Sequence, residues 1–266
     1  MAIPKGTNGE MPFLDHLEEL RWRIIYAGIA LLVGVGIGMA LAFQYDLVGI
    51  LAAPAAPYMG GAKLIVTHPV SLFSIRIQIA FVIGIGIASP VIGYQLWAFM
   101  SPALHRTERR MVIPVLVAGA VLFLIGVAMA WFIVLPMSLK WFYGLAGNSL
   151  QPMYEASEYI GFVTNLALAF GAAFELPLLL VALSAFGIVT AKALSDARKY
   201  AFLVIWAGAA IISPGDAITV TIALAVPLYL LYELSVVVAF AIERRRRAKR
   251  AKEEREEREE LASATP

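Results

Sequence analysis

The chain has 266 residues, of which 61% are hydrophobic and 15% are charged, and its mean hydropathy is +0.80. Soluble domains carry about a quarter charged residues and about half apolar residues, so this composition excludes an ordinary soluble protein and a disordered one. The net charge of +2 does not indicate a nucleic-acid-binding surface, and the absence of cysteine excludes disulfides, thiol catalysis and zinc–thiolate sites. We therefore predict a membrane protein.

Four apolar stretches are long enough to cross a bilayer. A span needs about 20 apolar residues for about 30 Å of hydrocarbon, and we predict spans at 24–43, 77–100, 111–137 and 159–186. Before the first of them, residues 11–23 repeat apolar side chains every three or four positions. This pattern predicts an amphipathic helix that lies at the membrane interface.

The last third of the chain predicts two further spans, at 200–212 and 217–242. The first of these is short, because its 12 strongly apolar residues rise only roughly 18 Å as a helix. The sequence SPGD at 213–216 forces a turn between them, and the alternative is that the pair forms one re-entrant hairpin. These spans belong to one membrane domain, 1–242, followed by a charged tail, 243–266.

Lysine and arginine are sorted by loop. Of the 21 basic residues, 18 precede the first span, follow the second, precede the fifth or follow the sixth. Basic residues concentrate on the cytoplasmic side of membrane proteins. The fold class predicted is therefore an all-α, multi-pass membrane protein with six transmembrane helices and both termini in the cytoplasm.

Glu175 lies near the middle of the fourth predicted span. An acid at this depth is costly, so it indicates a function by default. The plain alternative is a protonated side chain that is hydrogen-bonded between helices. The possible partners are Thr164, Asn165, Gln78, Gln95 and Glu233.

Glu19 and Glu108 lie in the segments predicted to be cytoplasmic. Each has a local alternative: Glu19 would pair with Arg23 four residues later, and Glu108 would neutralise the cations around it. Gly34 and Gly38 form a GxxxG pair, which predicts close helix packing.

The motifs of hydrolytic enzymes are missing from the sequence. It contains no P-loop, GxSxG or HExxH motif, and none of its three histidines lies in a predicted span. We therefore predict that the chain is not an enzyme and binds no cofactor and no metal.

Four segments, taken together in chain order, resemble the TatC family of twin-arginine protein translocases. They are 11–23 (MPFLDHLEELRWR), 89–110 (from SPVIGYQLWAF to ERR), 170–177 (FGAAFELP) and 213–216 (SPGD). The resemblance implies a concave, cup-like bundle of six helices with short fifth and sixth helices. It also implies a receptor for export signals with two consecutive arginines, which uses the proton-motive force to move folded proteins across the cell inner membrane.

The same resemblance implies partners and site residues. The partners would be twin-arginine signal peptides, the single-span subunits TatA and TatB, further copies of the chain and the lipid bilayer, but no nucleic acid. The signal-peptide patch would comprise Glu19, Arg21, Phe99 and Glu108. The contacts within the membrane and on the outer side would involve Glu175, Asp216 and Pro54.

A guanidinium group presents a planar fork that a carboxylate accepts through two bonds, which lysine cannot reproduce. We therefore expect Glu19 and Glu108 each to engage one arginine of the signal, with Phe99 against its apolar part. Gly215 and Val220 depart from the family pattern, which leaves the contacts around Asp216 open. A small secondary transporter or channel with Glu175 as its proton or ion site is the rival function, but it predicts an inverted repeat that is not visible.

Overall fold

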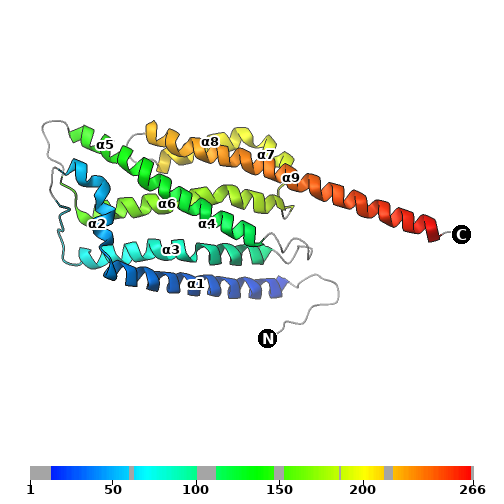
Figure 1. Cartoon of the computed structure of the whole chain (residues 1–266), viewed down its shortest axis with the longest axis horizontal. Coiled ribbons are helices and arrows are strands. Elements are labelled where there is room, and N and C mark those ends of the chain that lie inside the picture. The colour runs from blue at the N-terminus through cyan, green and yellow to red at the C-terminus, as the bar shows by residue number, and fades with distance from the viewer. Residues whose placement is uncertain are drawn as a thin grey trace. The chain divides into compact units, whose positions relative to one another are not determined.

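The computed structural model describes residues 13–59, 63–100, 112–146, 153–185, 187–212 and 218–264. Nearly all of them are helical, which confirms the all-α prediction (Figure 1). The chain forms two compact units, Met1–Ala172 and Ala173–Pro266, which are described one at a time.

The first unit contains α1 to α5, two irregular helical segments and most of α6. Its elements are α1 (Phe13–Gln44), α2 (Leu47–Ala52), the short 3-10 helix η1 (Ala53–Tyr58), α3 (Ser71–Met100), α4 (Val112–Met129), the π-helical turn η4 (Ala130–Val134), α5 (Leu135–Ala146) and α6 (Ala156–Ala185). The second unit begins in the last turns of α6. It continues with α7 (Ala191–Asp196), α8 (Arg198–Ile212) and α9 (Thr219–Ala264).

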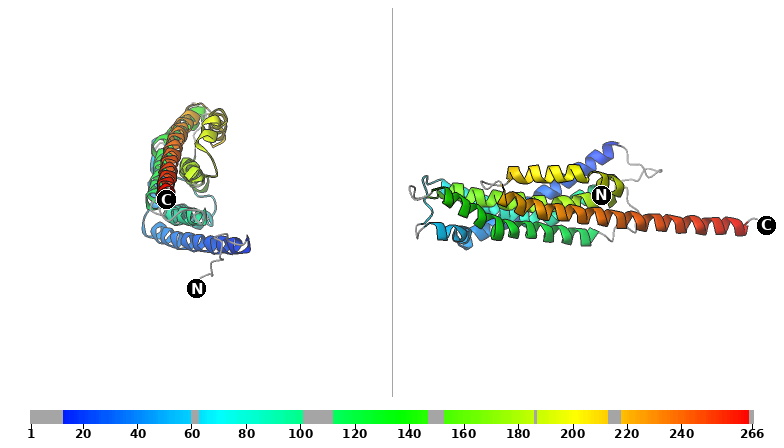
Figure 2. Two further views of the ribbon diagram at one scale, coloured as in Figure 1. Left: turned by 90° about the vertical axis from the view of Figure 1, so that its right-hand side faces the viewer. Right: turned by 90° about the horizontal axis from the view of Figure 1, so that it is seen from above.

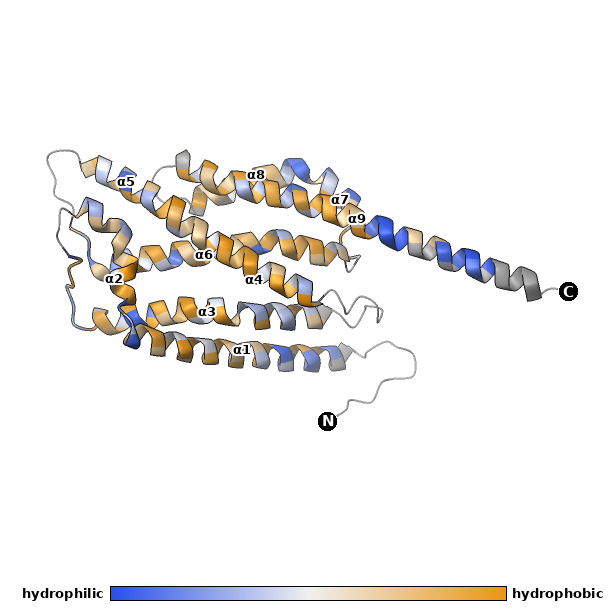
Figure 3. Cartoon of the chain, in the orientation of Figure 1, coloured by the Kyte–Doolittle hydropathy of each residue, from blue (hydrophilic) through white to orange (hydrophobic). Residues whose placement is uncertain are grey.

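In the described part of the chain, five helical stretches are long and apolar enough to cross a membrane, and their apolar character is visible in Figure 3. They are His16–Gln44, Ser71–Phe99, Leu116–Ala146, Ala156–Ala185 and Val220–Ala248. The predicted fifth span corresponds to α8, which has only 15 residues and rises roughly 22 Å. A multi-pass protein follows from these five helices, while the sixth crossing stays a prediction.

Two helices are longer than the spans predicted within them. α1 is continuous from Phe13 to Gln44, so the segment predicted as an interfacial helix forms its first turns. α9 likewise continues through the charged tail, where Figure 2 shows a single helix extending past α7 and α8. Alanine, glutamate, lysine and arginine dominate that tail, and all four favour a helix.

α1 and α3 lie side by side with their backbones in contact (Figure 1). A Cβ atom added at Gly38 would lie 2.3 Å from the carbonyl oxygen of Ala80, and one added at Gly34 would lie 2.5 Å from that of Gly84. Such distances leave no room for any side chain. The close packing predicted from the GxxxG pair is therefore confirmed.

One end of the first unit is held together by hydrogen bonds between segments that are distant in the sequence. The N–H of Ile65 donates to the carbonyl of Tyr154 at 3.0 Å, and the N–H of Ala156 donates to the carbonyl of Ile65 at 2.8 Å. The Tyr159 hydroxyl donates to the carbonyl of Leu51 at 2.9 Å. These bonds fix α2 and the 63–70 loop to the start of α6. We call this end, which also carries Asp46, the Asp46 end, and the opposite end of α1 the Glu19 end.

In the second unit, α7 packs against the middle of α9. The buried residues at this contact are Ala191, Leu194, Tyr232, Val236 and Ala239. The Tyr232 hydroxyl donates to the carbonyl of Leu194 at 2.6 Å. A buried polar bond therefore accompanies apolar packing at this contact.

Candidate functional site

The Glu19 end is organised by an ion pair within α1. The Nε and Nη2 atoms of Arg23 both donate to Oε1 of Glu19, with the Nε bond at 3.0 Å. The remaining Nη1 of Arg23 donates to Oε1 of Gln95 on α3 at 3.4 Å. One turn of helix separates Glu19 from Arg23, which places the two side chains on one face. The local pairing considered for Glu19 is therefore present, and it also links α1 to α3.

Phe99, near the end of α3, reaches the same place. Its ring stacks on the imidazole of His16, with centroids 4.4 Å apart and planes 12° apart. The Nδ1 atom of His16 lies 3.8 Å from Oε2 of Glu19, which is too far for a hydrogen bond. The structure thus brings together two of the predicted patch residues, Glu19 and Phe99, with His16 between them.

The second carboxylate oxygen of Glu19 is the unusual atom of this group. Oε2 is buried and has no hydrogen-bond partner among the described residues. A carboxylate oxygen in this position normally accepts at least one hydrogen bond, because burying it without a partner costs free energy. Glu19 therefore has one oxygen held by Arg23 and one still able to accept a donor.

The remaining predicted residues of the patch and of the outer-side contacts are exposed, lie at the other end of the unit, or fall outside the described residues. Arg21 is exposed on α1 and makes no hydrogen bond or ion pair with a described residue. Glu108 and Asp216 lie outside the residues that the structure describes. Pro54 lies at the start of η1, where its missing N–H costs no hydrogen bond.

Glu175 is half-buried in the part of α6 that belongs to the second unit. It has no hydrogen bond or ion pair with a described residue. Two residues later, the carbonyl of Pro177 accepts a bond from the hydroxyl of Ser235 at 3.0 Å. The alternative of a protonated Glu175 that is hydrogen-bonded between helices therefore has no partner among the residues that the structure describes.

Three of the partners suggested for Glu175 are bound elsewhere. The Thr164 hydroxyl donates to the carbonyl of Ile160 at 2.7 Å. Gln95 accepts from Arg23. Glu233 accepts from Arg198 at 3.1 Å and from the Tyr229 hydroxyl at 3.0 Å.

The group formed by Arg198, Glu233 and Tyr229 was not predicted. It joins the start of α8 to the middle of α9, and Phe202 adds an edge-to-face contact with Tyr229 at 5.6 Å. The only signal in the sequence is an acid within an apolar helix, and nothing there names its cation. No group of three or more potential metal ligands occurs among the described residues.

The sequence and the fold of this chain match those of known proteins. Residues 15–227 match the family model "Sec-independent protein translocase protein (TatC)". The TatC protein of Desulforapulum autotrophicum is 40% identical over 227 residues, which is 85% of this chain and 83% of that one. The TatC protein of Escherichia coli is 35% identical over 85% of this chain and 86% of its own length.

Solved structures agree with the sequence comparisons. A crystal structure of the twin-arginine translocase receptor TatC superposes with a TM-score of 0.70 at 39% identity, covering 86% of this chain and 99% of that one. A second crystal structure of the receptor, in the detergent DDM, gives a TM-score of 0.72. The chain therefore belongs to the TatC family of Sec-independent protein translocases, a family of membrane translocase subunits and not of enzymes.

Proposed function

We propose that this chain is the subunit that binds twin-arginine signal peptides and, driven by the proton-motive force, supports export of folded proteins across the cell inner membrane. In this proposal both termini lie in the cytoplasm, and α8 makes the short fifth of six crossings in a locally thinned bilayer. The proposed membrane domain is 1–242, a concave six-helix bundle, and 243–266 is its charged cytoplasmic tail. The sorting of basic residues supports the orientation.

The observation that carries the proposal is that only one of the two carboxylate oxygens of Glu19 accepts a hydrogen bond from a described residue. Arg23 holds Oε1, while Oε2 is buried without a hydrogen-bond partner among the described residues. A guanidinium that reached Oε2 would form a charge-assisted bond in a site shielded from water, where such bonds are strong. The neighbouring His16 side chain is 41% exposed, so its movement would admit the ligand.

Phe99 gives this position a second feature that suits arginine. Its ring already stacks with a flat polar side chain, the imidazole of His16. A guanidinium also stacks on aromatic rings, which an ammonium group does with less geometric preference. Glu108 would receive the second arginine, and the exposed Arg21 would contact a carbonyl or acid of the peptide.

The proposal is tested by peptide binding to the purified chain in detergent micelles. Replacing Glu19 by Gln should weaken binding of an Arg-Arg signal peptide by about ten- to hundredfold, since a hydrogen bond to a charged group contributes about 1.5–3 kcal/mol. Glu18→Gln is the matched control, because Glu18 is exposed on the same helix and carries the same charge. Equal binding by the two variants would contradict the role of Glu19.

Glu175 is proposed to contact the single helix of TatA or TatB, with Asp216 and Pro54 as further contact positions and with several copies of the chain in the complex. An acid within the membrane normally faces protein or water, and Glu175 has no partner among the described residues.

Cysteine scanning tests this contact, because the chain has no natural cysteine. Leu176→Cys, at a side chain that is 56% exposed, should form a disulfide with a cysteine in the partner helix. Phe174→Cys, at a side chain buried within the chain, should not. Disulfides between Leu176→Cys and the chain's own helices alone would contradict the contact.

A further inference from the structure

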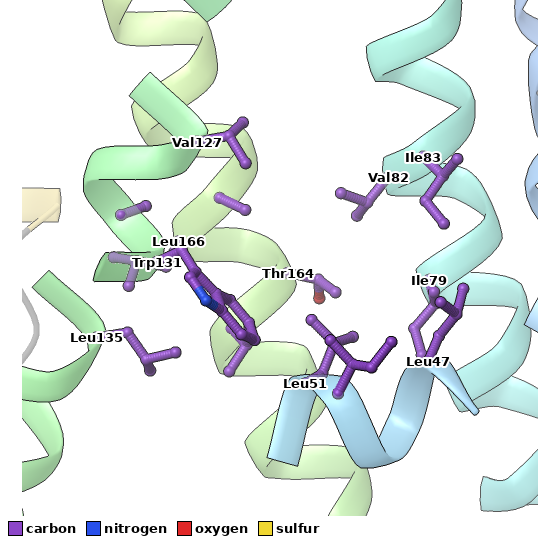
Figure 4. Close-up of a pocket in the computed structure, with 14 residues that line it drawn as sticks. Leu47, Leu51, Ile79, Val82, Ile83, Val127, Trp131, Leu135, Thr164 and Leu166 are labelled. Atoms are coloured by element: carbon purple, nitrogen blue, oxygen red, sulfur yellow. The ribbon is translucent and has the colours of Figure 1, made fainter. Parts of the chain in front are cut away.

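An apolar cavity of about 160 Å³ opens in the first unit, and none of the proposed sites uses it. Figure 4 shows it between α2, α3 and α6, with the π-helical turn η4 on one side. Its lining is almost entirely aliphatic: Leu51 from α2, Ile79 and Val82 from α3 and Val163 from α6 are typical. Trp131 of η4 contributes an aromatic ring to the lining.

The chemistry of the lining excludes water as a stable occupant. The hydroxyl of Thr164 is the main polar group of the wall, and it already donates to the carbonyl of Ile160 at 2.7 Å. A buried water needs two to four polar partners, which this cavity does not offer. The occupant must therefore be apolar.

The size of the cavity distinguishes a hydrocarbon chain from a helix. An apolar protein cavity of about 150 Å³ holds a molecule of benzene, which has six carbon atoms. A transmembrane helix is about 10–12 Å across with its side chains, so it does not fit in such a space. A flexible acyl chain matches the volume.

A cation without an acidic partner lies one helical turn away. Arg76 precedes Ile79 by three residues on α3, toward the Asp46 end. Its guanidinium donates to the carbonyl of Ala42 and lies 4.8 Å from the centroid of the Phe43 ring. It forms no ion pair with a described acid. The other donors of this half-buried group are therefore available to an anion.

Two of the acids at this end begin helices, and the third, Glu158, is exposed and forms no ion pair with a described residue. Asp46 accepts the N–H of Gly49 at 3.0 Å and so begins α2. Glu155 accepts the N–H of Glu158 at 2.9 Å and so begins α6. Arg76 is thus a positive charge without an acidic partner among the described residues, next to an apolar cavity. A phospholipid complements this arrangement, because it carries a negative phosphate next to an apolar acyl chain.

We propose that this cavity is a binding site for one phospholipid, with its phosphate on Arg76 and part of an acyl chain among the cavity residues. Ile79 and Ile83 line the cavity one and two turns beyond Arg76 on α3, roughly 5 and 10 Å along the helix. One lipid can therefore reach both the Arg76 guanidinium and the cavity. The bound lipid fills the space between α2 and α3 and so supports the Asp46 end.

The test measures lipid retention by native mass spectrometry of the full chain, titrated with phosphatidylglycerol in maltoside micelles. Ala167→Leu projects into the cavity and should weaken retention about tenfold. Ala169→Leu, the same change at a half-buried residue of α6 that does not line the cavity, should bind as the unaltered chain does. Equal retention by these two variants would overturn the chain-binding part.

The charge is tested separately. Arg76→Gln should weaken retention of phosphatidylglycerol about tenfold, whereas Lys63→Gln, which removes an exposed charge from the neighbouring loop, should not. Excess inorganic phosphate should not displace the lipid, because the acyl chain contributes most of the contact. Displacement by phosphate alone, or full retention by Arg76→Gln, would overturn the proposal.

A measurement without a cavity variant covers the case in which Ala167→Leu fails to fold. One molar equivalent of phosphatidylglycerol with brominated acyl chains should quench the fluorescence of Trp131, detected as the signal lost in Trp131→Phe. Absence of quenching would contradict an acyl chain in the cavity. Quenching that persists unchanged in Arg76→Gln would contradict the position of the phosphate.

Discussion

The two units hold their helices together by different means. In the first unit, α1 and α3 meet through Gly38 and Gly34, where backbone touches backbone. In the second unit, α7, α8 and α9 meet through side chains, with the Tyr232 hydroxyl on the Leu194 carbonyl and Arg198 on Glu233. In a bilayer, lipid tails are as apolar as leucine, so association requires close packing or polar bonds. Close backbone packing is the main contact between α1 and α3, although Arg23 also bonds to Gln95 there, whereas side-chain packing and side-chain bonds join the helices of the second unit.

The difference indicates how each contact responds to mutation. A backbone contact has no side chain that can adjust, so any added atom separates the helices. A side-chain bond can be lost singly, and the remaining packing continues to hold the helices. We therefore expect large, position-specific effects at α1–α3 and modest effects at α7–α9.

The largest effect is expected for Gly38→Ala. The new Cβ would lie 2.3 Å from the Ala80 carbonyl oxygen, so α1 and α3 must move apart, at a typical cost of about 1–3 kcal/mol. The free energy of unfolding, measured by denaturant titration in mixed micelles, should fall accordingly.

Gly36→Ala is the control with the opposite sign. A Cβ at Gly36 meets nothing within 4 Å, and alanine is favoured over glycine in a helix by roughly 1 kcal/mol. This variant should be as stable as the original chain or more so. If both variants change stability in the same direction, the backbone contact is not what holds α1 to α3.

A smaller effect is expected for Tyr232→Phe. The variant keeps the buried ring but loses the 2.6 Å bond to the Leu194 carbonyl, which should cost about 0.5–1.5 kcal/mol of unfolding free energy. Tyr200→Phe, at a side chain that is 73% exposed, should change nothing. A loss at Tyr232 as large as that at Gly38 would remove the distinction between the two contacts.

The smallest effect concerns pH and Glu155. The backbone N–H of Glu158 donates to this carboxylate at 2.9 Å, which lowers the pKa of Glu155 below its ordinary value. The ionised form is therefore favoured by folding. Its stabilising contribution is present above the ordinary carboxyl pKa and is lost as the pH falls through the lowered one.

Comparing thermal unfolding at neutral and acidic pH checks this sign. In Glu155→Gln the acid-induced drop in unfolding temperature should be slightly smaller than in the original chain. Glu254→Gln, on the exposed end of α9, should keep the full drop. An identical drop in both variants would mean that Glu155 contributes nothing to the start of α6.

Hydropathy and small residues predicted much of the fold. Long apolar stretches correspond to α1, α3, α6 and α9, and the GxxxG pair corresponds to the α1–α3 contact. These features are predictable because they depend on the chain's own length and composition in a bilayer.

The short helices α2 and α7 and the π-helical turn were not predicted, although some of their signals are present. Asp46 precedes the apolar run that forms α2, and Thr190 caps α7 through a bond to the N–H of Ala193. Hydropathy over a long window does not detect caps of this kind. The π-helical turn at Ala130–Val134 also has a local signal, because Pro136 lacks an N–H and its ring crowds the carbonyl four residues earlier, at Phe132.

The candidate site was predicted in part. The pairing of Glu19 with Arg23 was predicted, because residues four apart lie on the same face of a helix. It did not predict that Phe99 stacks on His16, because that contact joins α1 to the far end of α3. Nor did spacing identify Arg198 as the partner of Glu233.

The most direct test of the central claim is a double-mutant cycle between Glu19 and the arginines of a signal peptide. Changing one peptide arginine to lysine should weaken binding to the original chain at least tenfold, about 1.4 kcal/mol, but should have little effect on binding to Glu19→Gln. That coupling is expected because a guanidinium can donate to the unpartnered Oε2 of Glu19 and stack on the Phe99 ring at the same time, which the ammonium group of lysine cannot do with the same geometry. If every arginine-to-lysine change weakens binding equally in both proteins, Glu19 does not recognise the signal.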